Sequence, residues 1–200
     1  TGLTGLDINS SDVVADNGNI EITDIGDSDT IGVAGTVSIG NANTDLLTLD
    51  GTTYKTDGTT IYEADSGDTI LITGANVSIT TADDNLTFDA GNIVLSTGGT
   101  TTISTGTAGG ALQIDGTING TSSQTENLTI TTGTGSATIA GTIGGTNPLT
   151  TLSINASGNG AIDLAGIGDT NTVGTTGSGA ATIGNTSTTT LTLSGSFYRT

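Results

Sequence analysis

Residues 111–118, with the sequence Ala-Leu-Gln-Ile-Asp-Gly-Thr-Ile, return in related form as Ala-Thr-Ile-Ala-Gly-Thr-Ile at 137–143 and as Ala-Ile-Asp-Leu-Ala-Gly-Ile at 161–167. The spacing is about 25 residues, and Leu128 and Leu152 are separated by nearly the same interval. Within each copy apolar and polar residues alternate, which indicates short β-strands with one buried face. A repeat of this length with two or three short strands has the size of one turn of a β-solenoid.

The same alternating stretches occur along the whole chain. They are separated by Gly, Asn, Asp and Ser, which favour turns, and no segment shows the period of a helix. The stretches are 20–22, 37–39, 77–79, 86–88, 112–114, 128–130, 152–154, 162–164 and 191–193. We therefore expect an all-β protein with almost no helix, a parallel β-helix of about 20–25 residues per turn and about eight to ten turns.

The composition favours a thin core over a thick one. The chain has 33 Gly, 2% aromatic and 32% hydrophobic residues, against about 45–50% hydrophobic residues in an average domain. A β-sandwich, the main alternative, uses longer strands and aromatic anchors. Disorder is the second alternative because the chain is polar and highly charged, but the regular apolar stretches argue against it.

A second, longer repeat relates the two ends of the sequence. Residues 147–200 run parallel to residues 1–56 at an offset of about 142–146 residues. The matched elements are Leu3-Thr4-x-Leu6-x-Ile8-Asn9 with Leu149-Thr150-x-Leu152-x-Ile154-Asn155, Ile39-Gly40-Asn41 with Ile183-Gly184-Asn185, and Tyr54-Lys55-Thr56 with Tyr198-Arg199-Thr200. We expect residues 1–200 to be one continuous solenoid and a window of a tandem array, in which the residues after Thr200 resemble 57–60.

The charge and the missing residue types exclude several functions. The net charge of −18, from 20 acidic and 2 basic residues, leaves nothing to neutralise nucleic acid. No apolar window is long enough for membrane insertion. Without His and Cys, zinc sites and Ser-His or Cys-His catalysis lack their residues. We therefore expect no enzyme and no catalytic residue; a carbohydrate-active β-helix, the remaining enzymatic alternative, would need carboxylates opposite Lys55 or Arg199.

The two basic residues occupy equivalent positions of the long repeat. Lys55 follows Tyr54, and Arg199 follows Tyr198. A catalytic residue would rarely recur in each structural repeat. We interpret Tyr-Lys/Arg-Thr as a structural corner of the solenoid.

Seven aspartates are the candidate metal ligands, and calcium is the expected cofactor if there is one. They lie in Gly- and Ser-containing loops as three groups: Asp24, Asp27 and Asp29; Asp65 and Asp68; and Asp83 and Asp84. Ca²⁺ takes six to eight oxygen ligands, which such loops supply. The alternative is a set of solvated acidic loops, because neither an EF-hand nor a Gly-Gly-x-Gly-x-Asp repeat is present. Asp24 and Asp29 also become Gly166 and Asn171 in the second copy.

The repeats resemble those of a known group of proteins. Residues 110–120, 126–130 and 137–154, together with the two Tyr-Lys/Arg-Thr elements, are similar to repeats of filamentous-haemagglutinin-like giant bacterial surface proteins. The resemblance implies a secreted, right-handed parallel β-helix that serves in fibres or adhesion. We expect a structural module of an extracellular bacterial surface protein, forming a stiff stalk, coat or fibre, with itself as partner through head-to-tail contact or covalent continuation. The alternative is an adhesin module that binds a surface glycan or a partner cell.

Overall fold

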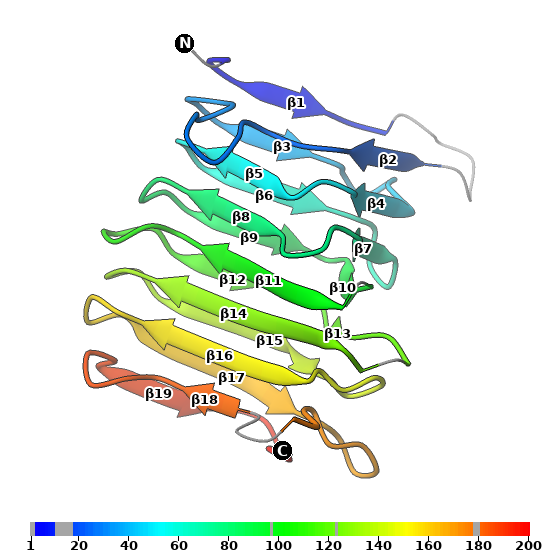
Figure 1. Cartoon of the computed structure of the whole chain (residues 1–200), viewed down its shortest axis with the longest axis vertical. Helices are drawn as coiled ribbons and strands as arrows, with labels where there is room; N and C mark the ends of the chain where they lie inside the picture. The colour runs from blue at the N-terminus through cyan, green and yellow to red at the C-terminus, as the bar shows by residue number, and fades with distance from the viewer. Residues whose placement is uncertain (1–2, 11–17, 97, 123, 178–180) are drawn as a thin grey trace.

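The computed structural model describes residues 3–10, 18–96, 98–122, 124–177 and 181–200. These residues form nineteen β-strands and no helix. The strands stack in parallel as a β-solenoid of about 7 turns, with the N-terminal turn at one end and the C-terminal turn at the other (Figure 1). The predicted all-β parallel β-helix is confirmed, and the alternatives of a β-sandwich and of a disordered chain are wrong.

The strands form three ladders, one on each face of the solenoid. Ladder 1 contains β1 (Leu6–Ile8), β3 (Val37–Ile39), β6 (Thr60–Glu63), β9 (Leu86–Asp89), β12 (Leu112–Ile114), the first halves of β15 (Ala137–Ile143) and β17 (Ala161–Ile167), and β19 (Thr190–Leu193). Ladder 2 contains β2 (Asn19–Ile22), β4 (Leu46–Leu49), β7 (Thr69–Ile72), β10 (Asn92–Leu95), β13 (Ile118–Asn119) and the second halves of β15 and β17. Ladder 3 contains β5 (Thr53–Thr56), β8 (Ser78–Thr81), β11 (Gly99–Ser104), β14 (Glu126–Thr132), β16 (Thr151–Ala156) and β18 (Ala181–Ile183).

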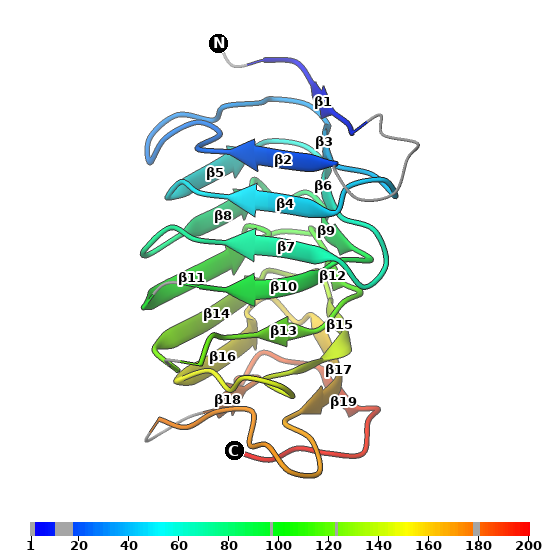
Figure 2. The same cartoon turned by 90° about the vertical axis from the view of Figure 1, so that its right-hand side faces the viewer.

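The direction of the ladders gives the handedness of the winding. In Figure 1 the strands of ladder 3 face the viewer and run to the left, and the strands of ladder 1 behind them run to the right. Ladder 2, which faces the viewer in Figure 2, leads from the back to the front. The chain thus winds clockwise as it moves away from the N-terminus, which makes the solenoid right-handed.

The solenoid has fewer turns than the sequence predicted. Val37 and its partner Thr60 are 23 residues apart, whereas Leu6 and its partner Val37 are 31 residues apart. The expected 20–25 residues per turn fit turns such as the one from Val37 to Thr60, but the expected eight to ten turns are too many, because several turns are longer. The extra residues lie in corner loops between ladders, such as 184–189, which add chain without adding strands.

Like side chains stack on like in the core, as in the 25-residue repeat. Ile114 lies beside Ile139, and Ile139 lies beside Leu164. Ile118 and Ile143 form the same kind of column on ladder 2. All five side chains are buried. Full burial of such an aliphatic side chain contributes about 1.5–3 kcal/mol relative to its exposed state, so the columns are the main source of stability.

The long repeat appears in the structure as a repeated set of backbone hydrogen bonds. The first copy contains bonds from Leu3 N to Gly32 O (3.1 Å) and from Lys55 N to Ile25 O (2.7 Å). The corresponding bonds of the second copy run from Leu149 N to Gly174 O (2.9 Å) and from Arg199 N to Ile167 O (2.8 Å). Equivalent strands also pair equivalently, β1 with β3 and β16 with β18.

The two copies nevertheless lie on different faces of the solenoid. β1 and β3 belong to ladder 1, while their counterparts β16 and β18 belong to ladder 3. β2 and β4 belong to ladder 2, while their counterparts, the first half of β17 and β19, belong to ladder 1. One long repeat therefore spans about five and two-thirds turns, not a whole number. The second copy is rotated by about one third of a turn relative to the first.

Candidate functional site

The Tyr-Lys/Arg-Thr elements form corners whose tyrosine hydroxyl joins two turns. In the first copy the Tyr54 hydroxyl accepts a hydrogen bond from Gly51 N (2.7 Å) and donates one to Ile22 O (2.8 Å). Gly51 must lack a side chain, because a Cβ there would lie 1.2 Å from Thr23 O. Burial raises the pKa of Tyr54, so the hydroxyl keeps its proton and remains a donor. These bonds agree with the structural role expected for this element.

The second copy builds the same corner. The Tyr198 hydroxyl accepts a hydrogen bond from Gly195 N (2.9 Å) and donates one to Leu164 O (2.6 Å). A Cβ on Gly195 would lie 1.3 Å from Ala165 O. The corner is therefore a property of the repeated sequence and not of its place in the stack.

An acidic turn lies against each basic residue. The Asp27 carboxylate accepts hydrogen bonds from Asp29 N (2.8 Å) and Thr30 N (2.7 Å), and the Lys55 ammonium donates to Ser28 O (3.0 Å). The two backbone N–H groups, with a further contribution from Lys55, hold the pKa of Asp27 below its usual value. The carboxylate thus closes the turn of its own loop.

The corresponding turn of the second copy has the same geometry. The Asp169 carboxylate accepts hydrogen bonds from Asn171 N (2.7 Å) and Thr172 N (2.6 Å), and these bonds likewise lower its pKa. The Arg199 guanidinium donates to Asp169 O (2.8 Å). The charged corner therefore occurs twice, once on each copy.

A shallow groove runs beside the first charged corner. Its volume is about 350 Å³, and the residues that line it carry polar or charged groups: Asp27, Ser28, Thr53, Lys55, Ser78 and Thr80. The strands β5 and β8 supply Lys55 and three of the hydroxyl groups, and the turn after Ile25 supplies Asp27 and the Ser28 hydroxyl. An ammonium, a carboxylate and several hydroxyls in one groove can hydrogen-bond a polar ligand such as a sugar, but they provide no nucleophile with an activating base.

The predicted calcium ligands instead bond mainly to backbone N–H groups. Asp24 accepts hydrogen bonds from Thr52 N (2.9 Å) and Thr53 N (2.8 Å) of the next turn. Asp83 likewise accepts hydrogen bonds from Thr107 N (2.6 Å) and Ala108 N (2.7 Å).

The remaining predicted ligands are close in sequence but form no ligand cluster. Asp65 accepts a hydrogen bond from Ser66 N (2.6 Å), and its own carbonyl accepts one from Asp68 N (2.9 Å). Asp29 is exposed, and Asp84 is partly exposed and offers its carbonyl to Thr81 Oγ1 (2.5 Å). Within the described ranges no group of three or more acidic side chains could hold a metal ion. Calcium binding at the seven aspartates stays a prediction, and the structure gives each of several carboxylates a local role in a turn.

Sequence reasoning missed a column of carboxylates along ladder 1. Glu63 and Asp89 are direct partners in β6 and β9, and Asp115 follows β12. Burial, and then the neighbouring carboxylates, raise the pKa of Glu63 and of Asp89. The three residues are spaced by 26 positions, which is the local turn length, so this spacing was the signal in the sequence.

A buried carboxylate was missed as well. Glu126 is 1% exposed. Burial favours its protonated form, but hydrogen bonds from the Thr121 hydroxyl (2.5 Å) and from backbone groups such as Thr125 N (3.0 Å) hold its pKa below the usual value. It closes the loop between ladders 2 and 3.

Comparisons with protein-family models, with curated proteins and with solved structures found no match for this chain. Among the described residues, no helix is long and apolar enough to cross a membrane. The architecture and the two charged corners therefore carry the functional argument.

Proposed function

We propose that this chain is a scaffold module, a stiff segment of an extracellular bacterial surface protein that serves as stalk, coat or fibre. The observation that carries the proposal is the regular stacking of three parallel ladders over an apolar core. Seven turns at the spacing of neighbouring strands give a rod of about 34 Å. Each turn adds backbone bonds and core columns to the one before it, so length is gained without a new fold.

The charge and composition support an exposed location. The acidic surface of a chain with a net charge of −18 keeps such rods hydrated and mutually repelling. Only Lys55 and Arg199 offer sites to trypsin-like proteases, and both lie in hydrogen-bonded corners. Immunogold labelling of intact cells that produce the protein tests the location, and label confined to the cell interior would overturn it.

The scaffold function is tested by digestion with a protease of broad specificity. We expect the ladders to survive under native conditions, with first cleavage in corner loops such as 26–32. As a matched control, Gly51→Val forces a side chain onto Thr23 O and disrupts one corner, so it should accelerate digestion. Cleavage of the native chain within the strands, as fast as that of the variant, would contradict the proposal.

The hydroxyl, carboxylate and ammonium groups around the groove beside Lys55 support a second candidate, an adhesin module that binds a surface glycan. Glycan-array binding of the native chain, lost in Lys55→Ala, would favour this function. Arg199→Ala is the matched control, because Arg199 occupies the same corner of the second copy but lies outside the groove. Binding that survives Lys55→Ala, or no binding at all, would leave the groove without this role.

A further inference from the structure

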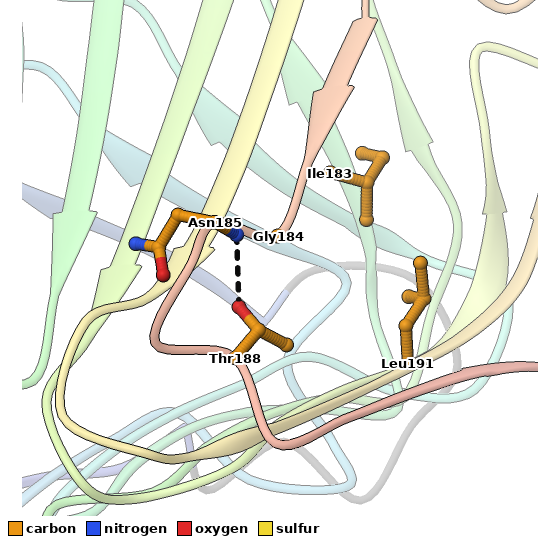
Figure 3. Close-up of a pocket in the computed structure, with 5 residues that line it drawn as sticks. All are labelled: Ile183, Gly184, Asn185, Thr188 and Leu191. Atoms are coloured by element: carbon orange, nitrogen blue, oxygen red, sulfur yellow. Dashed lines mark hydrogen bonds between the residues drawn. The ribbon is translucent and has the colours of Figure 1, made fainter.

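The C-terminal end of the solenoid is an open face of core side chains. Leu191 and Leu193 of β19 are 44% and 52% exposed. A depression of about 310 Å³ lies beside them and is lined by Ile183, Gly184, Asn185, Thr188 and Leu191, with Asn185 N bonded to Thr188 Oγ1 at 3.0 Å (Figure 3). Apolar groups in this position belong to the interior of a solenoid and call for a covering turn.

The first copy shows what covers the same residues inside this molecule. Ile39, Leu47 and Leu49 are the counterparts of Ile183, Leu191 and Leu193, and each is 0% exposed. They are covered by the next turn, in which β6 pairs with β3, β7 with β4 and β8 with β5.

The covering turn also fills the place that corresponds to the depression. Thr44, the counterpart of Thr188, is bonded through its carbonyl to Asp65 N (2.8 Å). Gly40, the counterpart of Gly184, lies directly under Glu63, because a Cβ on it would be 1.9 Å from Glu63 O. Residues 63–65 thus occupy the space that is open at the C-terminal end.

We propose that the C-terminal end is a docking surface for one further turn with the chemistry of residues 57–81. The turn takes the register on β18, β19 and the Tyr198 corner that β6, β7 and β8 take on β3, β4 and β5. The proposal deepens the scaffold function, on which it rests, by naming the partner and its register. The proposed contact repeats the one that β6, β7 and β8 already make with β3, β4 and β5 within the chain.

The strand pairing of the first copy disfavours direct stacking of a complete second copy on the C-terminal end. In such a stack β1 of the second copy would pair with β18, the counterpart of β3. Within the chain, however, β3 pairs with β1 on the side that faces the N-terminal end and with β6 on the side that faces the C-terminal end. The surface that β18 requires is that of β6, which an intact copy holds in its interior. The docking turn therefore starts at the equivalent of residue 57.

The register also fixes how a repeated array would present its charged corners. Ile25, which precedes the acidic turn, pairs with β5 on ladder 3, and its counterpart Ile167 lies on ladder 2. Each further repeat continued in this way moves the corner by another third of a turn. Three repeats, about 17 turns or 82 Å, bring it back to the same face.

The test uses the full chain with a copy of residues 57–81 appended after Thr200. We expect hydrogen exchange of the amides of β18 and β19 to slow by about tenfold or more relative to the unextended chain. The matched control carries an appended segment of the same composition in scrambled order. Equal exchange with the ordered and the scrambled segment would overturn the proposal.

Crosslinking tests the register itself, since the chain contains no cysteine. Ser38 is the partner of Ile61, so Thr182→Cys should crosslink through a short thiol reagent to a cysteine placed at the appended counterpart of Ile61. A cysteine at the appended counterpart of Glu63 should crosslink poorly, because it is offset by two residues. The reverse preference would overturn the register. If the unextended chain resists proteases but the segment does not dock, only this inference fails; if the unextended chain is itself digested, the scaffold function fails.

Discussion

The two copies of the long repeat carry equivalent core side chains at matched positions but differ in what covers them. Leu47 and Leu49 are 0% exposed in the first copy, whereas Leu191 and Leu193 are 44% and 52% exposed in the second. The local strands and the corner bonds are the same in both. Local sequence therefore determines strand and corner, while burial of a core residue is supplied by the neighbouring turn.

The largest test of this comparison is truncation of one leucine in each copy. Leu49→Ala leaves a cavity between turns and should lower the free energy of unfolding by about 2–5 kcal/mol. Leu193→Ala removes a side chain that is half-exposed and should cost less than about 1 kcal/mol. Urea unfolding followed by circular dichroism measures both. Equal losses would show that the end of the stack is covered in solution.

The next test removes the hydroxyl of each corner tyrosine. Tyr54→Phe deprives Gly51 N and Ile22 O of their partner inside the stack, and it should cost about 1–3 kcal/mol. In Tyr198→Phe the freed Gly195 N–H is exposed, so water can replace the hydroxyl there, whereas Gly51 N–H is buried; the loss should therefore be smaller. Thermal unfolding of the two variants under one condition gives the difference. A larger loss for Tyr198→Phe would contradict the role of the covering turn.

The strands were predictable because each depends only on alternation within a few residues. The stretches 86–88 and 112–114 became the strands β9 and β12. The predicted interval between Leu128 and Leu152 is confirmed, because the two residues are direct partners in β14 and β16. Tyr54 was recognised as part of a corner, but β5, the strand that contains it, does not show apolar alternation. Its place in a ladder is set by β8, which pairs with it.

The face on which each copy lies could not be predicted. The sequence period gives the length of the long repeat, but the number of turns depends on how many residues the corner loops consume. The roles of the acidic residues were equally hidden. Asp24 and Asp83 bond to backbone N–H groups 24 to 29 residues away, a contact that exists only once the turns are stacked.

The carboxylate column sets the middle of the molecule apart from both copies and provides a smaller test. Asp89 faces like charges, and the pKa of its carboxyl is raised by burial and by Asp115. The folded state thus binds this proton more tightly than the unfolded chain, so the stability it contributes is present at low pH and is lost as pH rises through the raised pKa. Asp89→Asn should raise stability at pH 7 by less than about 1 kcal/mol.

Thermal midpoints at pH 7 and at pH 3 measure the effect of the column. The gain of Asp89→Asn should shrink at pH 3, where the native carboxyl is protonated. Asp163→Asn is the matched control, because Asp163 is also a strand residue of ladder 1 but lies outside the column. A gain that is the same at both pH values would show that charge repulsion is not its cause.

The smallest effect is expected where the two copies are alike. Asp27 is exposed and Asp169 is partly exposed, and in both the pKa is lowered by two backbone N–H groups. A lowered pKa in the folded state means that the carboxylate contributes stability above its unfolded pKa and that this contribution is lost as pH falls through the folded pKa. Asp27→Asn and Asp169→Asn should each weaken the acid sensitivity of the thermal midpoint below about pH 4, by the same small amount. Because each turn is closed by its own backbone, covering by a neighbouring turn should not matter. A clear difference between the two variants would show that the acidic turn depends on the stack, as the leucines do.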